Sequence, residues 1–264
     1  MQDDIYQEIV KIRDKGGEAA LVTVISASGS TPREEGAKML VRADGSILGT
    51  IGGGSVELQI INETIGIISK GKPQILRYHL KEGEEPGMIC GGDVEVFVEP
   101  IVPEPTLYIF GGGHIALPLA KMAKLVGFKI VVIDDRPEFA TPQRFPEAEQ
   151  TLAIDFAKAF SRLKIDRSGY IVIITHGHKG DEVVLEGALG TKARYIGMIG
   201  SKNKKKTVFS HLLSKGISQG LLDKVYAPIG LKINAQTPAE IAVSILAELI
   251  QARSSPATQP EDDM

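Results

Sequence analysis

The spacing of hydrophobic and polar positions changes character near residue 104. In the first part, short apolar segments with helical spacing and with alternating spacing follow one another closely. Helices are predicted at residues 3–15 and 56–68, and strands at residues 19–25, 38–42, 46–50, 74–80 and 94–99. Asp44-Gly45 lies between two of these strands and predicts a tight hairpin turn. Local hairpins without strand–helix–strand alternation predict a small α+β domain over residues 1–102.

In the second part the order of predicted elements is different, because apolar strands alternate with helices. The prolines within residues 100–105 disfavour continued helix or sheet and mark the connection. Strands are predicted at residues 107–110, 129–133, 169–175 and 194–199, and helices at residues 114–126, 182–189 and 238–252. This alternation is typical of a doubly wound parallel sheet, so we expect a Rossmann-like α/β domain over residues 106–252. Residues 253–264 are polar and are expected to form a disordered tail.

The amino-acid composition excludes several classes of protein for this chain. Of the 264 residues, 43% are hydrophobic and 24% are charged, as in globular proteins. The chain has no signal-peptide pattern and no apolar run of about 18 residues, so we expect a cytoplasmic protein outside the membrane. The net charge of -3 gives no overall attraction to nucleic acid. The single cysteine, Cys90, excludes an intrachain disulfide and a zinc site built from several thiolates, and no structural metal is expected.

A glycine turn lies where a nucleotide would bind a Rossmann domain. Gly111, Gly113 and Ala116 form a G-x-G-x-x-A pattern between a predicted strand and a predicted helix. Gly111 would allow the tight turn, and Gly113 would let backbone N–H groups approach a phosphate. His114 begins the predicted helix, where its ring could face that phosphate. The alternative is that the turn only joins a strand to a helix.

An acidic residue is expected about 20 residues after such a turn, where it binds ribose hydroxyls. Asp134 ends the next predicted strand, and Asp135 and Arg136 could share or take over its role. NAD or NADP is the first candidate ligand. A pterin nucleotide and ATP remain open, because many folds of this kind change their ligand.

Two loops of the first part are suited to anions. Ser30, Thr31 and Arg33 offer hydroxyl groups and a guanidinium just after a predicted strand. Gly52, Gly53, Gly54 and Ser55 precede a predicted helix, so backbone N–H groups and the positive helix end would face the same direction. Together the loops predict a polar, phosphorylated ligand. The alternative is that both are tight turns, with Ser55 capping the helix.

The remaining candidates are a thiol and a histidine pair. Cys90 lies beside two glycines and after an acidic stretch, which favours an accessible thiol, although most cysteines are buried as small hydrophobic residues. His176 and His178 follow a predicted strand at the edge where doubly wound sheets bind ligands. They could supply acid–base groups or phosphate contacts. Alternatively, His176 caps a turn and Asp181 caps the next helix.

Ser201 and Lys202 follow the last predicted strand of the sheet. Four lysines are concentrated within residues 202–206, at the start of a helix. Because lysines there oppose the helix dipole, an anion or an acidic partner surface would have to compensate them. The alternative is a solvated charged face.

Many of these motifs together resemble the XdhC family of maturation factors for xanthine dehydrogenase. No single glycine run would be specific, but the set covers residues 20–250 in the family's order. The similar runs are residues 29–33, 36–39, 49–54, 90–92, 111–114, 134–139, 175–178, 196–201 and 227–231. At residues 202–204 the chain has Lys-Asn-Lys where the family is richer in arginine, and lysine lacks the planar fork that binds phosphate bidentately.

The resemblance implies a carrier protein rather than a turnover enzyme. Such a factor binds molybdenum cofactor (molybdopterin), supports its sulfuration with a cysteine desulfurase, and inserts it into an apo xanthine dehydrogenase-type molybdenum hydroxylase. In this interpretation the loops at residues 30–33 and 52–55 hold the pterin phosphate, and Cys90 lies near molybdenum or relays sulfur. The resemblance also implies a homodimer, to whose interface the apolar positions of residues 5–12 could contribute.

Two functions of other classes also fit the residues. An NAD(P)-dependent oxidoreductase acting on a small substrate would use the first part as its substrate domain and His114 or His176 as its acid–base group. It would exchange hydride with a small carbonyl compound or a pterin. A regulatory module would sense nucleotide and bind a protein, and it would contain neither molybdenum nor pterin when purified from cofactor-producing cells.

Overall fold

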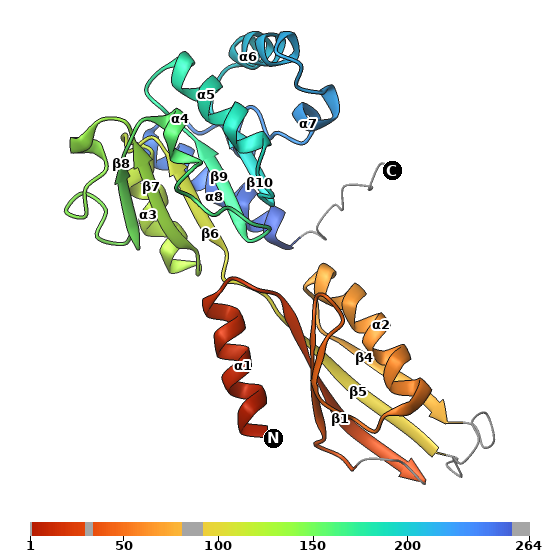
Figure 1. Ribbon diagram of the computed structural model, residues 1–264. Helices are drawn as coiled ribbons and strands as arrows, with labels where there is room; N and C mark the ends of the chain where they lie inside the picture. The colour runs from red at the N-terminus through yellow and green to blue at the C-terminus, as the bar shows by residue number, and fades with distance from the viewer. Residues whose placement is uncertain (1, 30–33, 81–91, 255–264) are drawn as a thin grey trace. The chain divides into compact units, whose positions relative to one another are not determined.

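The structure, a computed structural model, describes residues 2–29, 34–80 and 92–254 (Figure 1). The chain separates into two compact units, with the boundary between Pro103 and Glu104. The first unit has an antiparallel sheet covered by helices, and the second has a parallel sheet with helices on both faces. The predicted fold class, an α+β part followed by a Rossmann-like part, is therefore confirmed.

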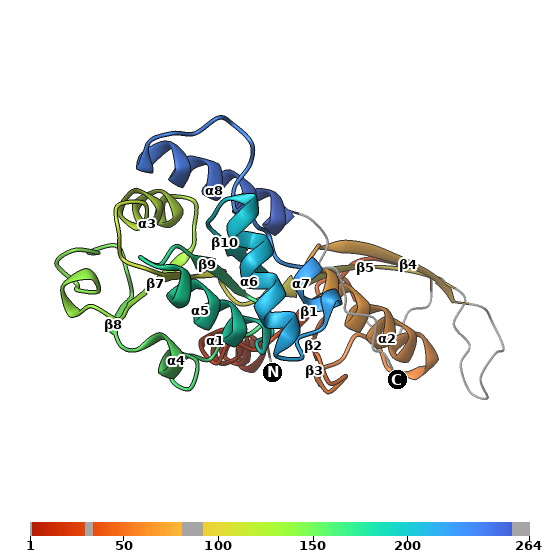
Figure 2. The same cartoon turned by 90° about the horizontal axis from the view of Figure 1, so that it is seen from above.

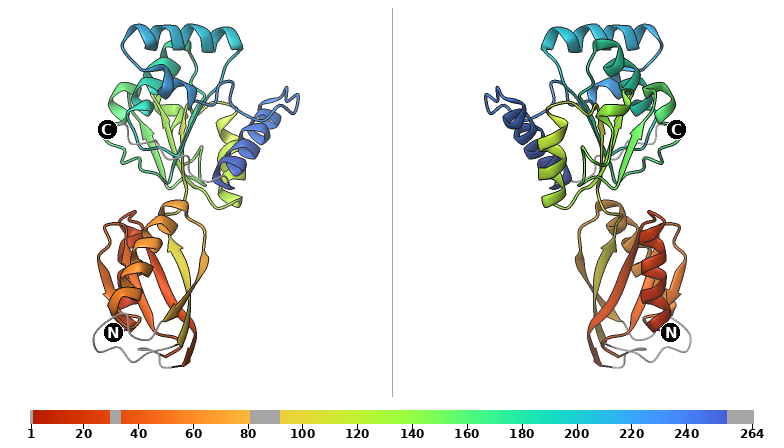
Figure 3. Two further views of the ribbon diagram at one scale, coloured as in Figure 1. Left: turned by 90° about the vertical axis from the view of Figure 1, so that its right-hand side faces the viewer. Right: turned by 90° about the vertical axis from the view of Figure 1, so that its left-hand side faces the viewer.

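The sheet of the first unit has the strand order β3-β2-β1-β5-β4, and its neighbouring strands are antiparallel. The strands are β1 (Ala19–Gly29), β2 (Lys38–Arg42), β3 (Ile47–Gly49), β4 (Gln74–Leu80) and β5 (Gly92–Ile101). Because side chains alternate along a strand, Val22 and Val24 join the core beneath α2 (Gly54–Lys70). Ala19 and Leu21 join a smaller core beneath α1 (Gln2–Asp14). The two helices thus cover opposite faces of this sheet (Figures 1 and 3).

Helix α1 uses its apolar face within its own unit. Ile5 is 2% exposed, and Ile9 and Ile12 pack against the small core beneath the helix. The prediction that residues 5–12 offer exposed apolar positions for a dimer interface is therefore wrong for Ile5, which the sheet buries, whereas Ile9 and Ile12 are only partly buried. Tyr6 and Val10 are large hydrophobic residues that this helix does expose.

The sheet of the second unit has the order β10-β9-β6-β7-β8 and is parallel throughout. Its strands are β6 (Thr106–Phe110), β7 (Lys129–Asp134), β8 (Gln150–Ala153), β9 (Gly169–Ile173) and β10 (Tyr195–Met198). Ile109 of the central strand β6 faces a core formed with α3 (Ala116–Leu125) and α8 (Pro238–Ser254). Phe110 faces the opposite core, formed with α4 (Phe156–Ala159), α5 (His178–Leu189), α6 (Lys202–Ser214) and α7 (Gln219–Asp223). The three layers are visible in Figure 2.

Some element ends differ from their predicted positions. Helix α5 begins at His178 rather than at residue 182, because the N–H of Asp181 already donates to the carbonyl of Gly177 and closes a helical turn. Helix α8 continues past residue 252 to Ser254. Arg253 holds this last turn, since its guanidinium donates to the carbonyl of Val126 at 2.9 Å and lies 5.0 Å from the ring centre of Phe128. Residues 255–264 lie outside the described residues.

Four short elements of the second unit were not expected, and two of them are the helices α4 and α7. The edge strand β8 contains the sequence Gln-Thr-Leu-Ala and has no fully buried side chain, so its alternation is too weak to predict a strand. A short 3-10 helix, η1 (Pro137–Phe139), follows β7. None of the helices in residues 2–29, 34–80 and 92–254 combines the length and the hydropathy that a bilayer-spanning segment requires.

Candidate functional site

The loops that follow β6, β7 and β9 meet at one edge of the parallel sheet. β6 pairs with β7 on one side and with β9 on the other, and the three strands run in the same direction. Residues 111–113, 134–136 and 175–177 are therefore neighbours at this edge. The chain passes from β6 to β7 on one side and later returns to β9 on the other, which makes the edge a topological switch point. Doubly wound sheets bind their ligands at such points.

Three glycines follow β6, and the third of them faces open space. A Cβ atom on Gly111 would lie 2.3 Å from the carbonyl oxygen of Ile174, and one on Gly112 would lie 2.0 Å from that of Phe139. Neighbouring backbone therefore packs directly against both positions, which excludes any side chain. At Gly113, no neighbouring heavy atom lies within 4 Å of a Cβ position. The turn is thus closed at its first two residues and open at its third.

Asp134, at the end of β7, is fully buried and binds protein donors with both carboxylate oxygens. Oδ2 accepts hydrogen bonds from the backbone N–H of Gly112 at 2.7 Å and from Nη2 of Arg136 at 3.0 Å. Oδ1 accepts from the backbone N–H of Arg136 at 3.0 Å and from its Nε at 2.9 Å. Since a carboxylate offers about four acceptor positions, Asp134 is saturated.

The ionisation of Asp134 follows from these contacts. Burial alone would raise the pKa of Asp134, but the hydrogen bonds from Arg136 and Gly112 and the charge of Arg136 hold that pKa below its ordinary value. The same carboxylate raises the pKa of Arg136. The pair is therefore an internal ion pair that fixes the glycine turn to the end of β7.

The segment after β7 binds the other polar group of Gly112. The carbonyl of Gly112 accepts a hydrogen bond from Nε of Arg144 at 3.0 Å. The guanidinium groups of Arg136 and Arg144 lie 3.7 Å and 5.0 Å from the ring centre of Phe139, within the range of cation–π interaction. Both the N–H and the carbonyl of Gly112 are thus engaged inside the protein, and this side of the turn is closed.

The part of the turn that remains open has the properties of a phosphate site. Helix α3 begins after Ile115 without a side-chain cap and without an acidic residue in its first turn. Its first N–H groups and the positive end of its dipole are therefore suited to an anion. Gly113 leaves space beside this end, and the side chain of His114 is exposed. Gly113 and His114 are therefore the residues of this turn that could hold an anionic group.

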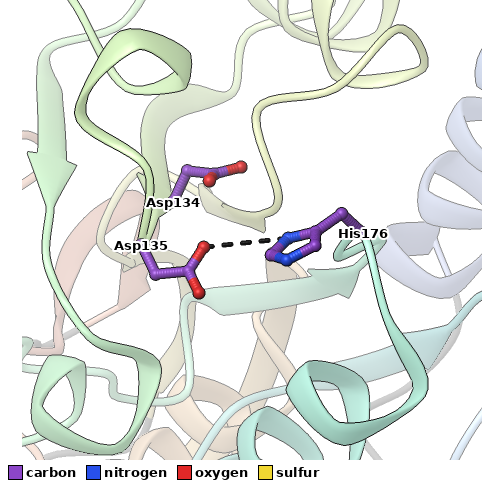
Figure 4. A group of neighbouring side chains, drawn as sticks. All are labelled: Asp134, Asp135 and His176. Carbon is purple, nitrogen blue, oxygen red and sulfur yellow. Dashed lines mark ion pairs between the residues drawn. The ribbon is translucent and has the colours of Figure 1, made fainter.

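Asp135 and His176 point toward each other from the loops that follow β7 and β9, the two strands that flank β6 (Figure 4). Oδ1 of Asp135 lies 3.7 Å from Nδ1 of His176, and their side chains are 37% and 49% exposed. With Asp134 they offer ligand atoms within 4.8 Å of one another, the spacing of a metal site. The oxygens of Asp134 are already bound by Arg136 and Gly112, so a cation would have to break that ion pair.

A second buried carboxylate fixes the loop after β9. Oδ1 of Asp181 accepts from the backbone N–H of Thr175 at 3.0 Å and from its hydroxyl at 2.6 Å, and Oδ2 pairs with Nζ of Lys204. Asp181 therefore does not cap α5, whose cap residue is Gly177. The backbone of His178 begins that helix, and its side chain is outside the described part of the structure.

Three polar residues that follow β10 have partners within the protein. Ser201 caps α6 by accepting a hydrogen bond from the backbone N–H of Lys204 at 3.2 Å. The ammonium of Lys204 is neutralised by Asp181, and the side chain of Lys205 lies 5.0 Å from the ring centre of Phe209. Lys202 is exposed at the first position of the helix.

In the first unit, the glycine loop before α2 donates hydrogen bonds to the carboxylate of Glu57, a residue of α2 itself. Oε2 of Glu57 accepts hydrogen bonds from the hydroxyl of Thr50 at 2.5 Å and from the N–H groups of Ile51 at 2.8 Å and Gly53 at 3.1 Å. Burial raises the pKa of Glu57, but these hydrogen bonds outweigh it and lower the pKa below its ordinary value.

The start of α2 contradicts the alternative interpretation, in which Ser55 caps this helix. The cap residue of α2 is Gly53, and it makes no side-chain bond, so Ser55 is not the cap. Gly52 and Gly53 are half-buried, whereas Gly54 and Ser55 are exposed. The other predicted ligands of the first unit lie outside the described residues; they are Ser30, Thr31, Arg33 and Cys90.

The sequence patterns missed the acids that organise these loops. Glu57 is the fourth residue of α2 and Asp181 is the fourth residue of α5, and each bonds back to the backbone of the loop before its helix. An acid one turn into a helix that follows a glycine-containing loop is the signal that could have identified both. Arg144 and Lys204 could not be identified in this way, because their partners are distant in sequence.

Comparisons with known proteins cover both units. The model of the XdhC and CoxI family matches residues 12–79, and that of the XdhC Rossmann domain matches residues 107–249. YqeB of Escherichia coli (strain K12) is 33% identical over 255 residues, which are 96% of this chain and 47% of YqeB. A probable xanthine dehydrogenase subunit of Bacillus subtilis (strain 168) is 34% identical over 158 residues, 60% of this chain and 46% of that protein. The chain therefore spans about half the length of these two relatives.

Two further proteins match along most of their length. The molybdenum cofactor insertion chaperone PaoD of Escherichia coli (strain K12) is 24% identical over 273 residues, covering 90% of this chain and 84% of PaoD. The crystal structure of a xanthine dehydrogenase from Bacillus halodurans is 25% identical and aligns with a TM-score of 0.52. That alignment covers 96% of this chain and 97% of the other.

Proposed function

Since the chain belongs to the XdhC family, we propose that it is a maturation factor that binds molybdenum cofactor and delivers it to an apo xanthine dehydrogenase-type hydroxylase. One observation carries this proposal. Along both of its units the chain matches PaoD, a protein named as a molybdenum cofactor insertion chaperone. In this role the cofactor is cargo, which the protein binds, protects and releases. A cysteine desulfurase is the proposed partner for sulfuration.

The first unit is the proposed cargo site. Gly54 and Ser55 are exposed at the start of α2, where a backbone N–H and a hydroxyl are available to the pterin phosphate. Glu57 supports this role indirectly, because its hydrogen bonds to Ile51 and Gly53 fix the turn that presents them. Ser30, Thr31 and Arg33 are proposed as further phosphate ligands. Cys90 is proposed to lie near molybdenum or to relay sulfur.

The second unit is the proposed nucleotide site, with NAD or NADP as the first candidate. Gly113 and the uncapped start of α3 would bind a phosphate, and His114 is exposed beside them. His176 lies across the end of β6 and would face the same ligand. Ser201 and Lys202, with the side chain of His178, are proposed as more distant contacts at this edge.

The test is the cofactor content of the full-length protein. The protein is purified from cells competent in cofactor synthesis, and its molybdenum and pterin are measured beside those of Cys90→Ala and of Met88→Ala, a control in the same segment. We expect molybdenum and pterin near one per chain, lowered in Cys90→Ala alone while its unfolding is unchanged. Absence of cofactor, together with failure to bind added cofactor, would refute the carrier function.

Delivery requires its own measurement. Loaded protein is mixed with an apo xanthine dehydrogenase-type hydroxylase, with and without a cysteine desulfurase and cysteine, and hydroxylase activity is followed over time. The proposal expects activation that depends on the desulfurase. Hydride exchange with NAD(P)H and a small carbonyl compound, without any activation of a hydroxylase, would instead establish an oxidoreductase.

We further propose that the protein is a cytoplasmic homodimer. A solution mass measurement at micromolar concentration tests the oligomeric state, and a monomer alone would refute it.

A further inference from the structure

Residues 134–136 contain both kinds of side chain that decide nucleotide choice in a Rossmann domain. An acid after the second strand binds the free hydroxyls of the adenosine ribose, whereas an arginine nearby accommodates a 2′-phosphate. Asp134, Asp135 and Arg136 follow one another here. The order of residues alone therefore leaves NAD and NADP open, and the contacts of these side chains must decide between them.

The guanidinium of Arg136 is already bound by groups of the protein itself. Its Nε and Nη2 form two parallel hydrogen bonds with the fully buried carboxylate of Asp134, and its guanidinium lies against Phe139. Turning Arg136 toward a 2′-phosphate would leave Asp134 as an unpaired buried charge, which is strongly unfavourable. The second guanidinium of this segment, Arg144, is held by the carbonyl of Gly112.

Asp134 is equally unable to bind a ribose. Its acceptor positions are filled by Arg136 and by the N–H of Gly112. The exposed acid is Asp135, whose Oδ1 lies 3.7 Å from Nδ1 of His176 and 4.0 Å from Nε of Arg136. Because β7 and β9 flank β6, this pair spans the end of β6, where a ligand on the glycine turn must pass. A carboxylate there accepts hydrogen bonds from ribose hydroxyls and repels a phosphate.

We infer that the second unit selects a dinucleotide with a free 2′-hydroxyl and rejects one with a 2′-phosphate, with Asp135 as the specificity-determining residue. This inference rests on the proposed nucleotide binding. The ion pair between buried Asp134 and half-buried Arg136 is its structural basis, since that pair holds the arginine that would otherwise bind the 2′-phosphate.

Calorimetric titration of the full-length protein with NAD⁺ and with NADP⁺ tests the inference. We expect NAD⁺ to bind roughly tenfold or more tightly than NADP⁺. Asp135→Asn should reduce the affinity ratio to about threefold or less, because it removes the repelling charge while keeping an oxygen acceptor. Asp223→Asn, at an exposed acid of α7, is the control and should keep the wild-type ratio.

The outcomes separate this inference from the function on which it rests. Equal affinities, a preference for NADP⁺, or an unchanged ratio in Asp135→Asn would overturn the assignment of Asp135 while leaving nucleotide binding intact. Failure of both dinucleotides to bind would overturn the nucleotide site itself, and the inference with it. Molybdenum cofactor content is measured independently of either result.

Discussion

Exchanging Asp134 for asparagine removes a buried charge that has four hydrogen-bond donors, whereas the same exchange at Asp135 removes an exposed one. Breaking a buried ion pair costs about 3–5 kcal/mol, and an exposed pair is worth about 0–1 kcal/mol. Asp134 is fully buried, whereas the side chain of Asp135 is 37% exposed and lies 3.7 Å from His176. Asp134→Asn should therefore lower the free energy of unfolding by about 3 kcal/mol, and Asp135→Asn by less than about 1 kcal/mol.

Scanning calorimetry of the two variants measures the difference. For a domain of about 150 residues, 1 kcal/mol corresponds to roughly 2–4 °C, so the melting temperature of the second unit should fall by about 6–12 °C in Asp134→Asn. Because the folded pKa of Asp134 is lowered, its stabilisation is present above the unfolded pKa, near 3.9, and is lost as the pH falls through the folded pKa. The gap between wild type and Asp134→Asn should narrow below about pH 4. Equal losses in both variants at neutral pH would refute the reasoning.

Five further substitutions test the remaining contacts of these loops. Glu57→Ala removes the acceptor of three donors and should lower the stability of the first unit by about 2 kcal/mol, measured by urea unfolding followed by circular dichroism; a loss below about 0.5 kcal/mol would contradict it. Gly112→Ala should prevent normal packing of the second unit, because the added methyl group meets a backbone oxygen, whereas Gly113→Ala should fold; their melting temperatures compare the two. Lys204→Met leaves buried Asp181 unpaired and should cost about 3 kcal/mol, and part of that loss should be recovered on adding Asp181→Asn, which thermal unfolding of the double variant would reveal.

The overall fold could be predicted because its signals are local. The continuous apolar runs at the start of β1 and along β6 directly reflect burial on both faces of each strand. The position of the glycine turn after β6 also followed from its pattern, since only glycine fits at Gly111 and Gly112. The ends of α5 and α8 were placed less well, because Asp181 and Arg253 form contacts that local spacing does not reveal.

The site could be located from the sequence, but the partners of its charged residues could not. The pattern placed Asp134, Asp135 and Arg136 at the right edge of the sheet and treated them as interchangeable. Burial separates them, since Asp134 and Arg136 neutralise each other and Asp135 remains exposed. The contact between Asp135 and His176 also escaped prediction, because it joins strands that are not neighbours in the chain or in the sheet.

The central position of β6 also sets the order in which the second unit can assemble. Thr106 of β6 pairs with Lys129 of β7 on one side and with Gly169 of β9 on the other. One edge of β6 can therefore pair with β7 early in synthesis, while the other edge stays unpaired until β9 has left the ribosome. During that interval the apolar residues 107–110 expose an open strand edge, the kind of surface on which growing chains aggregate. Rapid synthesis of residues 111–173 would shorten this exposure, so expression yield is expected to depend on translation speed through that stretch.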